Sequence, residues 1–349
     1  MSVRHLYLHL PFCPSICPYC SFHVERVDRK KMDRFAARLE ADLRDTGPMD
    51  ALETVYFGGG TPTAFSTTQL EAILDVVDRF VPRPRDCETT MEANPSTLPA
   101  EKCRMLRARG INRISLGAQS FDDEVLKTLG RHHSSAAIRV AWEYLRAAGF
   151  NNLNLDLIFG VPGQTLETWE STLRAALELK PDHLSCYNLT YEEDTPYMDR
   201  LRQGICHEDD DCNETMFTRA EDLLSDAGWH HYEISNYARS GFECRHNVAY
   251  WTGRDYLGVG PSAVSTVRGK RWKMADGRRV EMESLSAELR AREQALLELR
   301  TSRGTAADFF RFEQWKPLVE HGFAVFENDR LVLTREGRLR ADEIAVHLC

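Results

Sequence analysis

Short apolar runs alternate with amphipathic stretches along the first 190 residues of the chain. In the stretches between most of these runs, apolar positions recur with the spacing of a helix face. Strands separated by helices predict βα repeats around a parallel sheet, either doubly wound or closed into a full or partial barrel. The strand-like runs occupy residues 5–10, 53–57, 88–93, 111–117, 152–160 and 183–189.

Start and stop signals bound the predicted helices. Ser66 and Gln69 have the spacing of a capping box at the start of an apolar helix face. Pro99 and Gly110 are typical of the first and last positions of a second helix. Two further helices are expected from the same kinds of signal, over residues 134–148 and 164–180.

From about residue 280 the alternation of strands and helices gives way to a mainly helical pattern. Residues 283–304 have a strong amphipathic helix pattern, and a second helix is expected over 308–322. A hairpin turning at Asn328 and Asp329 and a final helix complete a small, mainly helical, winged-helix-like unit. We therefore expect three parts, namely a core (1–235), a connecting segment (236–280) and a C-terminal domain (281–349).

Composition narrows the class of protein. Hydrophobic residues make up 42% of the 349 residues and charged residues 28%, which is typical of globular proteins. The net charge of −9 argues against broad nucleic-acid binding. No apolar run approaches the ~20 residues of a membrane span, and the start of the chain lacks the features of an export signal. We expect a cytoplasmic protein.

Ten cysteines are many for a protein without an export signal. Disulfides are improbable in a reducing compartment, so these residues should be metal ligands, nucleophiles or core residues. The acidic run at 207–212 is expected to cap a helix at the surface. Seven cysteines are scattered, and for them we expect packing roles: Cys87, Cys103, Cys186, Cys206, Cys212, Cys244 and Cys349.

The other three cysteines, Cys13, Cys17 and Cys20, lie within eight residues as C-x3-C-x2-C. Pro14 and Pro18 keep this segment out of a regular helix, so it is expected to be a loop. A zinc ribbon would need a fourth ligand from a second knuckle, and a thioredoxin-type pair would leave Cys13 unexplained. Three thiolates on a four-iron cluster would leave one iron open to another ligand.

Residues unusual for core strands stand at the carboxyl ends of all six predicted strands. Because the carboxyl ends of parallel strands meet at one face, and ligands bind at that face, one site built from six strand ends is expected. These features are the cysteine loop, the run Gly58-Gly59-Gly60-Thr61-Pro62, Glu92, Gln119, Asp156 and Asn188.

These motifs, in this order, resemble the radical S-adenosylmethionine superfamily. More narrowly, the chain resembles the oxygen-independent coproporphyrinogen III oxidase (HemN) group, including its heme-chaperone branch, HemW. The resemblance covers nearly the whole chain, through YLHLPFC, YFGGGTPT, MEANP, ISLGAQSF, LGRHH, NLDLIFGVPGQT and HNVAYW. It implies an α/β fold with a partial (β/α)6 TIM-like barrel.

The resemblance also implies cofactors and their ligands. Cys13, Cys17 and Cys20 would hold a [4Fe-4S] cluster, whose open iron would bind S-adenosylmethionine. The implied chemistry is reductive cleavage of the sulfonium to methionine and a 5′-deoxyadenosyl radical. The residues implied to line the S-adenosylmethionine pocket are Tyr7, Tyr19, Gly59, Gly60, Thr61, Glu92, Gln119, Arg131 and Asp156.

Details of sequence favour the chaperone branch. The oxidases carry a fourth cysteine where this chain has Phe22, and they have a longer arm ahead of the cluster loop. Residues 246–251 match the HNxxYW motif of HemW, whereas Val264 replaces a histidine common in relatives. The expected function is heme binding and transfer to recipient hemoproteins. The alternative is an enzyme, coproporphyrinogen III dehydrogenase; radical modification of RNA is disfavoured by the acidic balance.

The HNxxYW segment has a physical rationale as a heme site. A neutral imidazole can ligate heme iron, and aromatic rings offer flat apolar surface to a porphyrin. The residues expected to contact heme are His246, Asn247, Tyr250 and Trp251. An electron donor for the cluster and a second copy of the chain in a homodimer are further expected partners.

Overall fold

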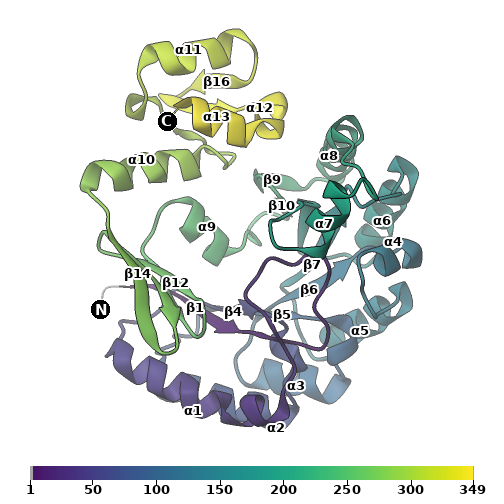
Figure 1. Cartoon of the computed structure of the whole chain (residues 1–349), viewed down its shortest axis with the longest axis vertical. Coiled ribbons are helices and arrows are strands. Elements are labelled where there is room, and N and C mark those ends of the chain that lie inside the picture. The colour runs from purple at the N-terminus through teal and green to yellow at the C-terminus, as the bar shows by residue number, and fades with distance from the viewer. Residues whose placement is uncertain (1–2, 349) are drawn as a thin grey trace.

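A computed structural model describes residues 3–348, and its centre is a nine-stranded sheet (Figure 1). Six neighbouring strands are parallel, as a partial (β/α)6 barrel requires, and they coincide with the six predicted runs. They are β1 (His5–Leu10), β4 (Thr54–Gly59), β5 (Glu88–Ala93), β6 (Arg113–Gln119), β7 (Leu153–Phe159) and β8 (His183–Asn188).

Helices cover the outer face of this sheet (Figure 1). The predicted capping box is formed, because the Gln69 amide donates to Ser66 Oγ at 3.2 Å and the Ser66 amide donates to Gln69 Oε1 at 2.9 Å. Helix α1 is not among the helices that the sequence predicts. The helices are α1 (Arg29–Thr46), α2 (Thr67–Phe80), α3 (Ala100–Ala108), α4 (Asp123–Thr128), α5 (Ser135–Ala147) and α6 (Leu166–Glu178), with 3-10 turns η1 (Pro62–Ala64) and η2 (Pro95–Thr97).

The two faces of the strands differ in chemistry. On β1, Leu6 and Leu8 are fully buried in the apolar core. Alternate residues point the other way, and there Tyr7 hydrogen-bonds His9, with 3.0 Å between Oη and Nδ1, and stacks on Tyr56 of β4. The barrel is therefore held together by apolar packing outside the strands and is polar inside, where the site is built.

The sheet extends beyond the six parallel strands at both edges. β10 (Asn236–Ala238) and β9 (His230–Glu233) are antiparallel beyond β8, whereas β11 (Leu257–Val259) is parallel beside β1. Helix α9 (Arg245–Trp251) lies between these two edges (Figure 1). Segment 236–280 thus contributes strands to the core sheet, and the boundary at residue 235 stays a prediction.

Further elements pack around the barrel. β12, β13 and β14 form an antiparallel sheet that the sequence patterns do not predict. Asp209 caps α8, because its carboxylate accepts from the Cys212 amide at 3.0 Å, as expected for the acidic run. The bounds are β2 (Phe12–Cys13), β3 (Glu25–Arg26), α7 (Pro196–Arg202), α8 (Asp210–Asp226), β12 (Val264–Val267), β13 (Lys270–Ala275) and β14 (Arg278–Ser284).

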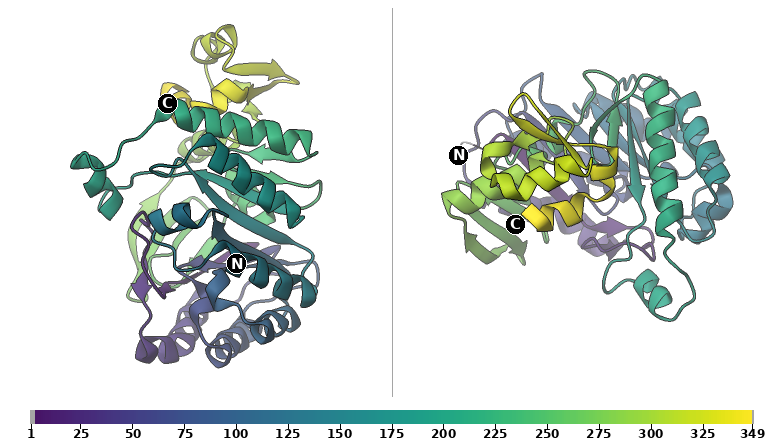
Figure 2. Two further views of the ribbon diagram at one scale, coloured as in Figure 1. Left: turned by 90° about the vertical axis from the view of Figure 1, so that its right-hand side faces the viewer. Right: turned by 90° about the horizontal axis from the view of Figure 1, so that it is seen from above.

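The C-terminal domain is stacked beyond the barrel with a small core of its own (Figure 2). The hairpin turns at Asn328 and Asp329, whose φ values of 52° and 62° are those of a tight two-residue turn. The mixture of helices and a three-stranded sheet confirms the predicted fold class. Its elements are α10 (Ala287–Glu298), β15 (Thr305–Ala306), η3 (Ala307–Phe309), α11 (Phe312–Glu320), β16 (Ala324–Glu327), β17 (Arg330–Leu333), α12 (Arg335–Leu339) and α13 (Ala341–Leu348).

The scattered cysteines lie where packing roles would put them. Cys87, Cys103, Cys186 and Cys244 are buried, whereas Cys206 and Cys212 are half-buried. The expectation for Cys349 lies outside the described residues. In the part of the chain that the structure describes, no helix has both the length and the apolar composition of a membrane span.

Candidate functional site

The cysteine loop follows β1 at the carboxyl end of the parallel strands. The Glu25 amide donates to the Pro11 carbonyl at 2.8 Å, and the Val27 amide donates to the Cys13 carbonyl at 3.0 Å. These two bonds hold the two ends of the loop together. Cys13 is buried, and Cys17 and Cys20 are half-buried. All three line one cavity of about 430 Å³, as the sequence predicts for a loop that wraps a shared cofactor.

Hydrogen-bond donors reach two of these sulfur atoms. The Thr61 hydroxyl lies 3.5 Å from Cys13 Sγ, and an Arg131 N–H lies 3.3 Å from Cys17 Sγ. Burial raises the pKa of Cys13 and of Cys20, and the nearby Arg131 charge opposes this shift. Donors to sulfur and a nearby guanidinium stabilise thiolate ligands.

The donor set fits an iron–sulfur cluster better than a single ion. Across residues 3–348, no group of three or more His, Cys, Asp or Glu side chains is arranged to hold a metal ion. Three soft thiolates around one cavity are the ligands that an iron–sulfur cube takes, and such a cube is larger than one ion.

The glycine run at the end of β4 packs directly against the cysteine loop. A Cβ on Gly60 would lie 2.6 Å from the carbonyl carbon of Pro11, and Gly59 has a φ of 106°. Side chains are thus excluded at both positions. The Gly59 amide donates to Glu92 Oε2 at 3.1 Å, which fixes the run against β5 and brings its backbone to the cavity wall.

Two half-buried carboxyl groups, Glu92 and Asp156, line the same cavity. The Tyr56 hydroxyl donates to Glu92 Oε1 at 3.0 Å, and burial together with the charge of Asp156 raises the pKa of Glu92 to about 7. Ser115 and Asn154 donate to Asp156 at 3.1 and 2.8 Å, and burial raises the pKa of Asp156 as well. These groups can accept hydrogen bonds from an amino or hydroxyl group of a ligand.

The structure brings eight of the nine residues predicted for S-adenosylmethionine to this cavity. Gln119 reaches it from a bulge beside Gly117, where its φ is 67°, and Arg131 donates to the Gly117 carbonyl at 3.1 Å. Tyr7 is the exception, because it lies behind Gly58 against Tyr56 and does not line the cavity. The lining residues are Tyr19, Gly59, Gly60, Thr61, Glu92, Gln119, Arg131 and Asp156.

Sequence reasoning missed several polar residues of the cavity wall. Tyr56 and Ser115 could have been found, because they alternate along β4 and β6 with residues that were predicted to face the ligand. Tyr187 also lies on a strand, β8, whereas the others lie in loops and turns between the strands. The missed polar residues are Ser15, Ser21, Tyr56, Asn94, Ser96, Ser115, His132, Tyr187, Thr190 and Glu192.

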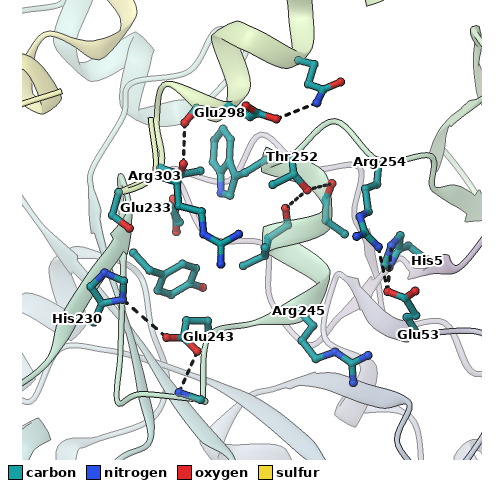
Figure 3. A pocket seen from close by; sticks show the side chains of 18 residues that line it. His5, Glu53, His230, Glu233, Glu243, Arg245, Thr252, Arg254, Glu298 and Arg303 are labelled. Atoms are coloured by element: carbon teal, nitrogen blue, oxygen red, sulfur yellow. Dashed lines mark hydrogen bonds and ion pairs between the residues drawn. The ribbon is translucent and has the colours of Figure 1, made fainter. Parts of the chain in front are cut away.

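A second cavity, of about 600 Å³, lies between α9, the β9 edge and α10, and its wall includes the amino-terminal end of β1 (Figure 3). It is thus distant along the strands from the cysteine loop. Of the four residues expected to contact heme, Trp251 lines this cavity. His246, Asn247 and Tyr250 do not, and Tyr250 is 45% exposed beside Tyr256.

His246 packs against the barrel interior. Its Nδ1 lies 2.8 Å from Thr54 Oγ1 and its ring centroid lies 5.1 Å from that of Tyr56. Burial lowers the pKa of His246 to about 3, so the imidazole is neutral near pH 7. The bond to Nδ1 orients the ring, and within the described residues Nε2 has no hydrogen-bond partner.

Comparison with known proteins places the fold in a class. Residues 7–176 match the Radical SAM superfamily, and the matched segment carries the cysteine loop, the glycine run and both carboxyl groups. Coproporphyrinogen III oxidase (HemN) from Escherichia coli has the same fold, with a TM-score of 0.85, 22% identity and coverage of 99% of this chain and 90% of that chain. The chain is a radical S-adenosylmethionine protein.

Two curated relatives identify the branch. The chain is 37% identical to the heme chaperone HemW of Bacillus subtilis over 275 residues, which are 77% of this chain and 72% of the relative. It is 36% identical to the heme chaperone HemW of Mycobacterium tuberculosis over 366 aligned positions, covering 97% of this chain and 93% of the relative. The chain belongs to the HemW family, as the sequence predicts.

Proposed function

We propose that this protein is a heme chaperone, which binds heme and passes it to recipient hemoproteins. The observation that carries this proposal is the near full-length similarity to a HemW relative. The HNxxYW segment of this chain supports it. The structure adds a cavity of about 600 Å³ beside that segment and apart from the cysteine loop. A chaperone of this kind can hold its cargo away from the cofactor.

The first cavity is the proposed cofactor site. Cys13, Cys17 and Cys20 would hold the [4Fe-4S] cluster, which when bound supplies the electron for reductive cleavage of S-adenosylmethionine. Gly59 and Glu92 would hold the methionine end of S-adenosylmethionine through hydrogen bonds. Thr61 and Arg131 donate to two of the sulfur atoms. The remaining residues of the proposed ligand set are Tyr19, Gly60, Gln119 and Asp156. Tyr7 does not line the cavity and would act by packing against Tyr56.

The α9 segment is the proposed heme site, with Trp251 as a flat apolar wall. Iron ligation by His246 stays a prediction. Because His246 does not line the second cavity, ligation there requires its ring or α9 to turn outward. If His246→Ala binds heme with the affinity and absorption spectrum of the natural sequence, the assignment of His246 as ligand is wrong.

The second candidate function is coproporphyrinogen III dehydrogenase, favoured by the likeness in fold to the HemN structure. Phe22 argues against it. This residue occupies the position of the oxidases' fourth cysteine, and its side chain is 72% exposed at the rim of the first cavity. A phenylalanine supplies neither a metal ligand nor an acid–base group there.

An electron donor for the cluster is a further proposed partner, because reductive cleavage needs an external electron. A cytoplasmic location is proposed because an exposed iron–sulfur cluster and free thiols suit a reducing compartment. The homodimer and the role of Val264, which lies exposed at the start of β12, stay predictions.

The proposal is tested with anaerobically reconstituted protein in two parallel assays. One titrates heme and follows the porphyrin absorption; the other supplies coproporphyrinogen III, S-adenosylmethionine and a reductant. We expect stoichiometric heme binding and no protoporphyrinogen. Catalytic formation of protoporphyrinogen would support the enzyme instead, and failure to bind heme would overturn the chaperone.

A further inference from the structure

The second cavity combines flat apolar walls with charged groups. Tyr232 and Trp251 supply aromatic surface, and Val248 and Ala249 supply aliphatic surface from α9. The cavity is bounded on the far side by α10 and by the loop that follows it, so both the barrel and the C-terminal domain contribute to it (Figure 3). A planar, largely apolar ligand with charged edges suits such walls.

The acidic residues of this cavity already have partners. Glu53 pairs with Arg254 at 3.1 Å and with Arg4 at 2.6 Å. Glu298 pairs with Arg330 at 3.1 Å and accepts from Gln294 at 2.8 Å. These carboxylates are therefore neutralised without any ligand.

The other two acidic residues of the cavity, Glu243 and Glu233, also have hydrogen-bond partners within the protein. Glu243 accepts from the Gly241 amide at 3.1 Å and lies 3.7 Å from His230. Glu233 is buried, accepts from Asn236 and from the Ser235 amide, and burial raises its pKa to about 7. Neither acid is paired with an arginine of the cavity.

Two arginine side chains of the cavity are left without a carboxylate. The Arg245 backbone amide donates to the Glu88 carboxylate at 3.1 Å. The Arg245 guanidinium donates one N–H to the Asp86 carbonyl at 2.7 Å, and its other N–H groups have no protein partner among residues 3–348. The Arg303 guanidinium has no hydrogen bond or ion pair in the same range, and it extends from the loop after α10 toward the middle of the cavity (Figure 3). In a protein of net charge −9, two unpaired guanidinium groups on one cavity indicate an anionic ligand.

One residue of the cavity wall, His5, has a ring nitrogen without a hydrogen-bond partner. The His5 side chain is only 4% exposed, its Nδ1 lies 3.0 Å from Thr54 Oγ1, and its Nε2 is buried without a hydrogen-bond partner. Glu53 Oε2 lies 3.9 Å from this Nε2. An imidazole oriented through one nitrogen and free at the other is the arrangement typical of a metal ligand.

We propose that the second cavity is the cargo pocket, in which Arg245 and Arg303 each bind one carboxylate of an iron porphyrin dicarboxylate. This inference rests on the proposed chaperone function and adds how the cargo is recognised. The two arginines come from α9 and from the C-terminal domain. Both carboxylates are therefore bound only when the domain is docked.

The docking contacts hold Arg303 in place. The Ser302 amide donates to the Tyr232 carbonyl at 2.9 Å, and Thr301 forms an isolated bridge with Glu233 of β9. Arg330 of β17 donates to the Arg303 carbonyl at 2.8 Å. A shift of the C-terminal domain would carry Arg303 away from the cavity, so the same contact can govern release of the cargo.

The test compares two ligands and two double variants. Heme and its dimethyl ester, which lacks both negative charges, are titrated into the full-length protein and followed by porphyrin absorption. The variants are Arg245→Gln/Arg303→Gln and the matched control Arg104→Gln/Arg278→Gln, in which two exposed arginines outside both cavities lose the same charge. Thermal unfolding is recorded for every protein.

We expect the natural sequence and the control to bind heme at least about tenfold more tightly than the diester, as expected for two charge-assisted hydrogen bonds. The Arg245/Arg303 variant should bind the two ligands equally. Equal affinity of the natural sequence for both ligands would overturn this inference and leave the chaperone function standing. Failure of the natural sequence to bind heme at all would overturn both.

Discussion

Tyr56 illustrates how one residue for which the sequence predicts no role can organise a site. Its hydroxyl donates to Glu92 at 3.0 Å, and its ring contacts His246 at 5.1 Å between centroids. Burial and the charge of Glu92 raise the pKa of Tyr56 well above 10, so the hydroxyl stays a donor. It therefore joins the proposed cofactor site to the proposed heme segment.

Removing this hydroxyl should weaken cofactor binding without disturbing the core. For Tyr56→Phe we expect a roughly fivefold to tenfold loss of affinity for S-adenosylmethionine, because one hydrogen bond to Glu92 contributes about 1 kcal/mol. Calorimetric titration of the cluster-loaded protein measures it. The control is Tyr144→Phe on the exposed face of α5. Unchanged affinity would remove Glu92 from the proposed ligand set.

The cysteines offer a second prediction at the scale of single residues. Cys17→Ser should abolish retention of the cluster, because serine cannot supply the soft thiolate that iron–sulfur clusters need. Iron and sulfide analysis after anaerobic reconstitution measures the loss. Cys212→Ser, at a half-buried position outside the loop, should retain a full cluster. Equal iron content in the two variants would contradict the assignment.

At the scale of elements, the glycine run sets how closely β4 approaches the cysteine loop. A Cβ on Gly60 would lie 2.6 Å from the Pro11 backbone, which cannot move without shifting Cys13. Gly60→Ala should therefore lower the free energy of unfolding by about 1–3 kcal/mol and reduce cluster loading. Urea unfolding measures the stability and iron analysis measures the cluster loading. Unchanged stability and unchanged cluster loading would show that the loop can move to accept the added methyl group.

The elements also show why some structure could be predicted and some could not. The six core strands and the helix starts at Ser66 and Asp209 are confirmed, because apolar periodicity and capping act over a few residues. The β12–β14 sheet carries mainly polar and charged residues, so its sequence has no clear strand alternation. The placement of α9 depends on pairing between residues about 190 positions apart, such as Thr54 and His246.

At the scale of the whole molecule, ion pairs join the C-terminal domain to the barrel. Glu221 of α8 accepts from Arg335 of α12 at 3.1 Å and from Arg338, and Arg335 also binds Asp222 at 2.7 Å. Burial alone would raise the pKa of Glu221, but His231, whose Nδ1 lies 3.7 Å from Glu221 Oε1, and the two guanidinium groups outweigh it and lower the pKa to about 2.

This shift predicts a pH-dependent contribution to stability. The pKa of a glutamate in the unfolded chain is near 4.5, so the contact stabilises the folded protein fully above that pH and is lost as the pH falls toward 2. Glu221→Gln should lower the free energy of unfolding by about 1–2 kcal/mol at pH 7. Denaturant unfolding of the cofactor-free protein between pH 7 and pH 3 should show this difference shrinking; a difference independent of pH would contradict the account.

The residues of the first cavity could be predicted from the sequence far better than those of the second. Each predicted strand ends at or near a residue of the cofactor site, so local sequence motifs are enough to predict that site. The second cavity combines β1, α9 and the loop after α10, and its unpaired arginines, Arg245 and Arg303, become visible only when the partners of every neighbouring acid are known. Charge pairing of this kind is a property of the folded molecule.

The most direct test of the central claim is transfer of heme. The reconstituted protein is loaded with heme, freed of excess by gel filtration and mixed with a heme-free recipient hemoprotein, whose own absorption and activity are then followed. We predict that heme leaves the chaperone and restores the recipient, and that the Arg245→Gln/Arg303→Gln variant retains less heme through gel filtration and therefore restores less recipient. Heme that stays bound while the recipient remains inactive would contradict the account.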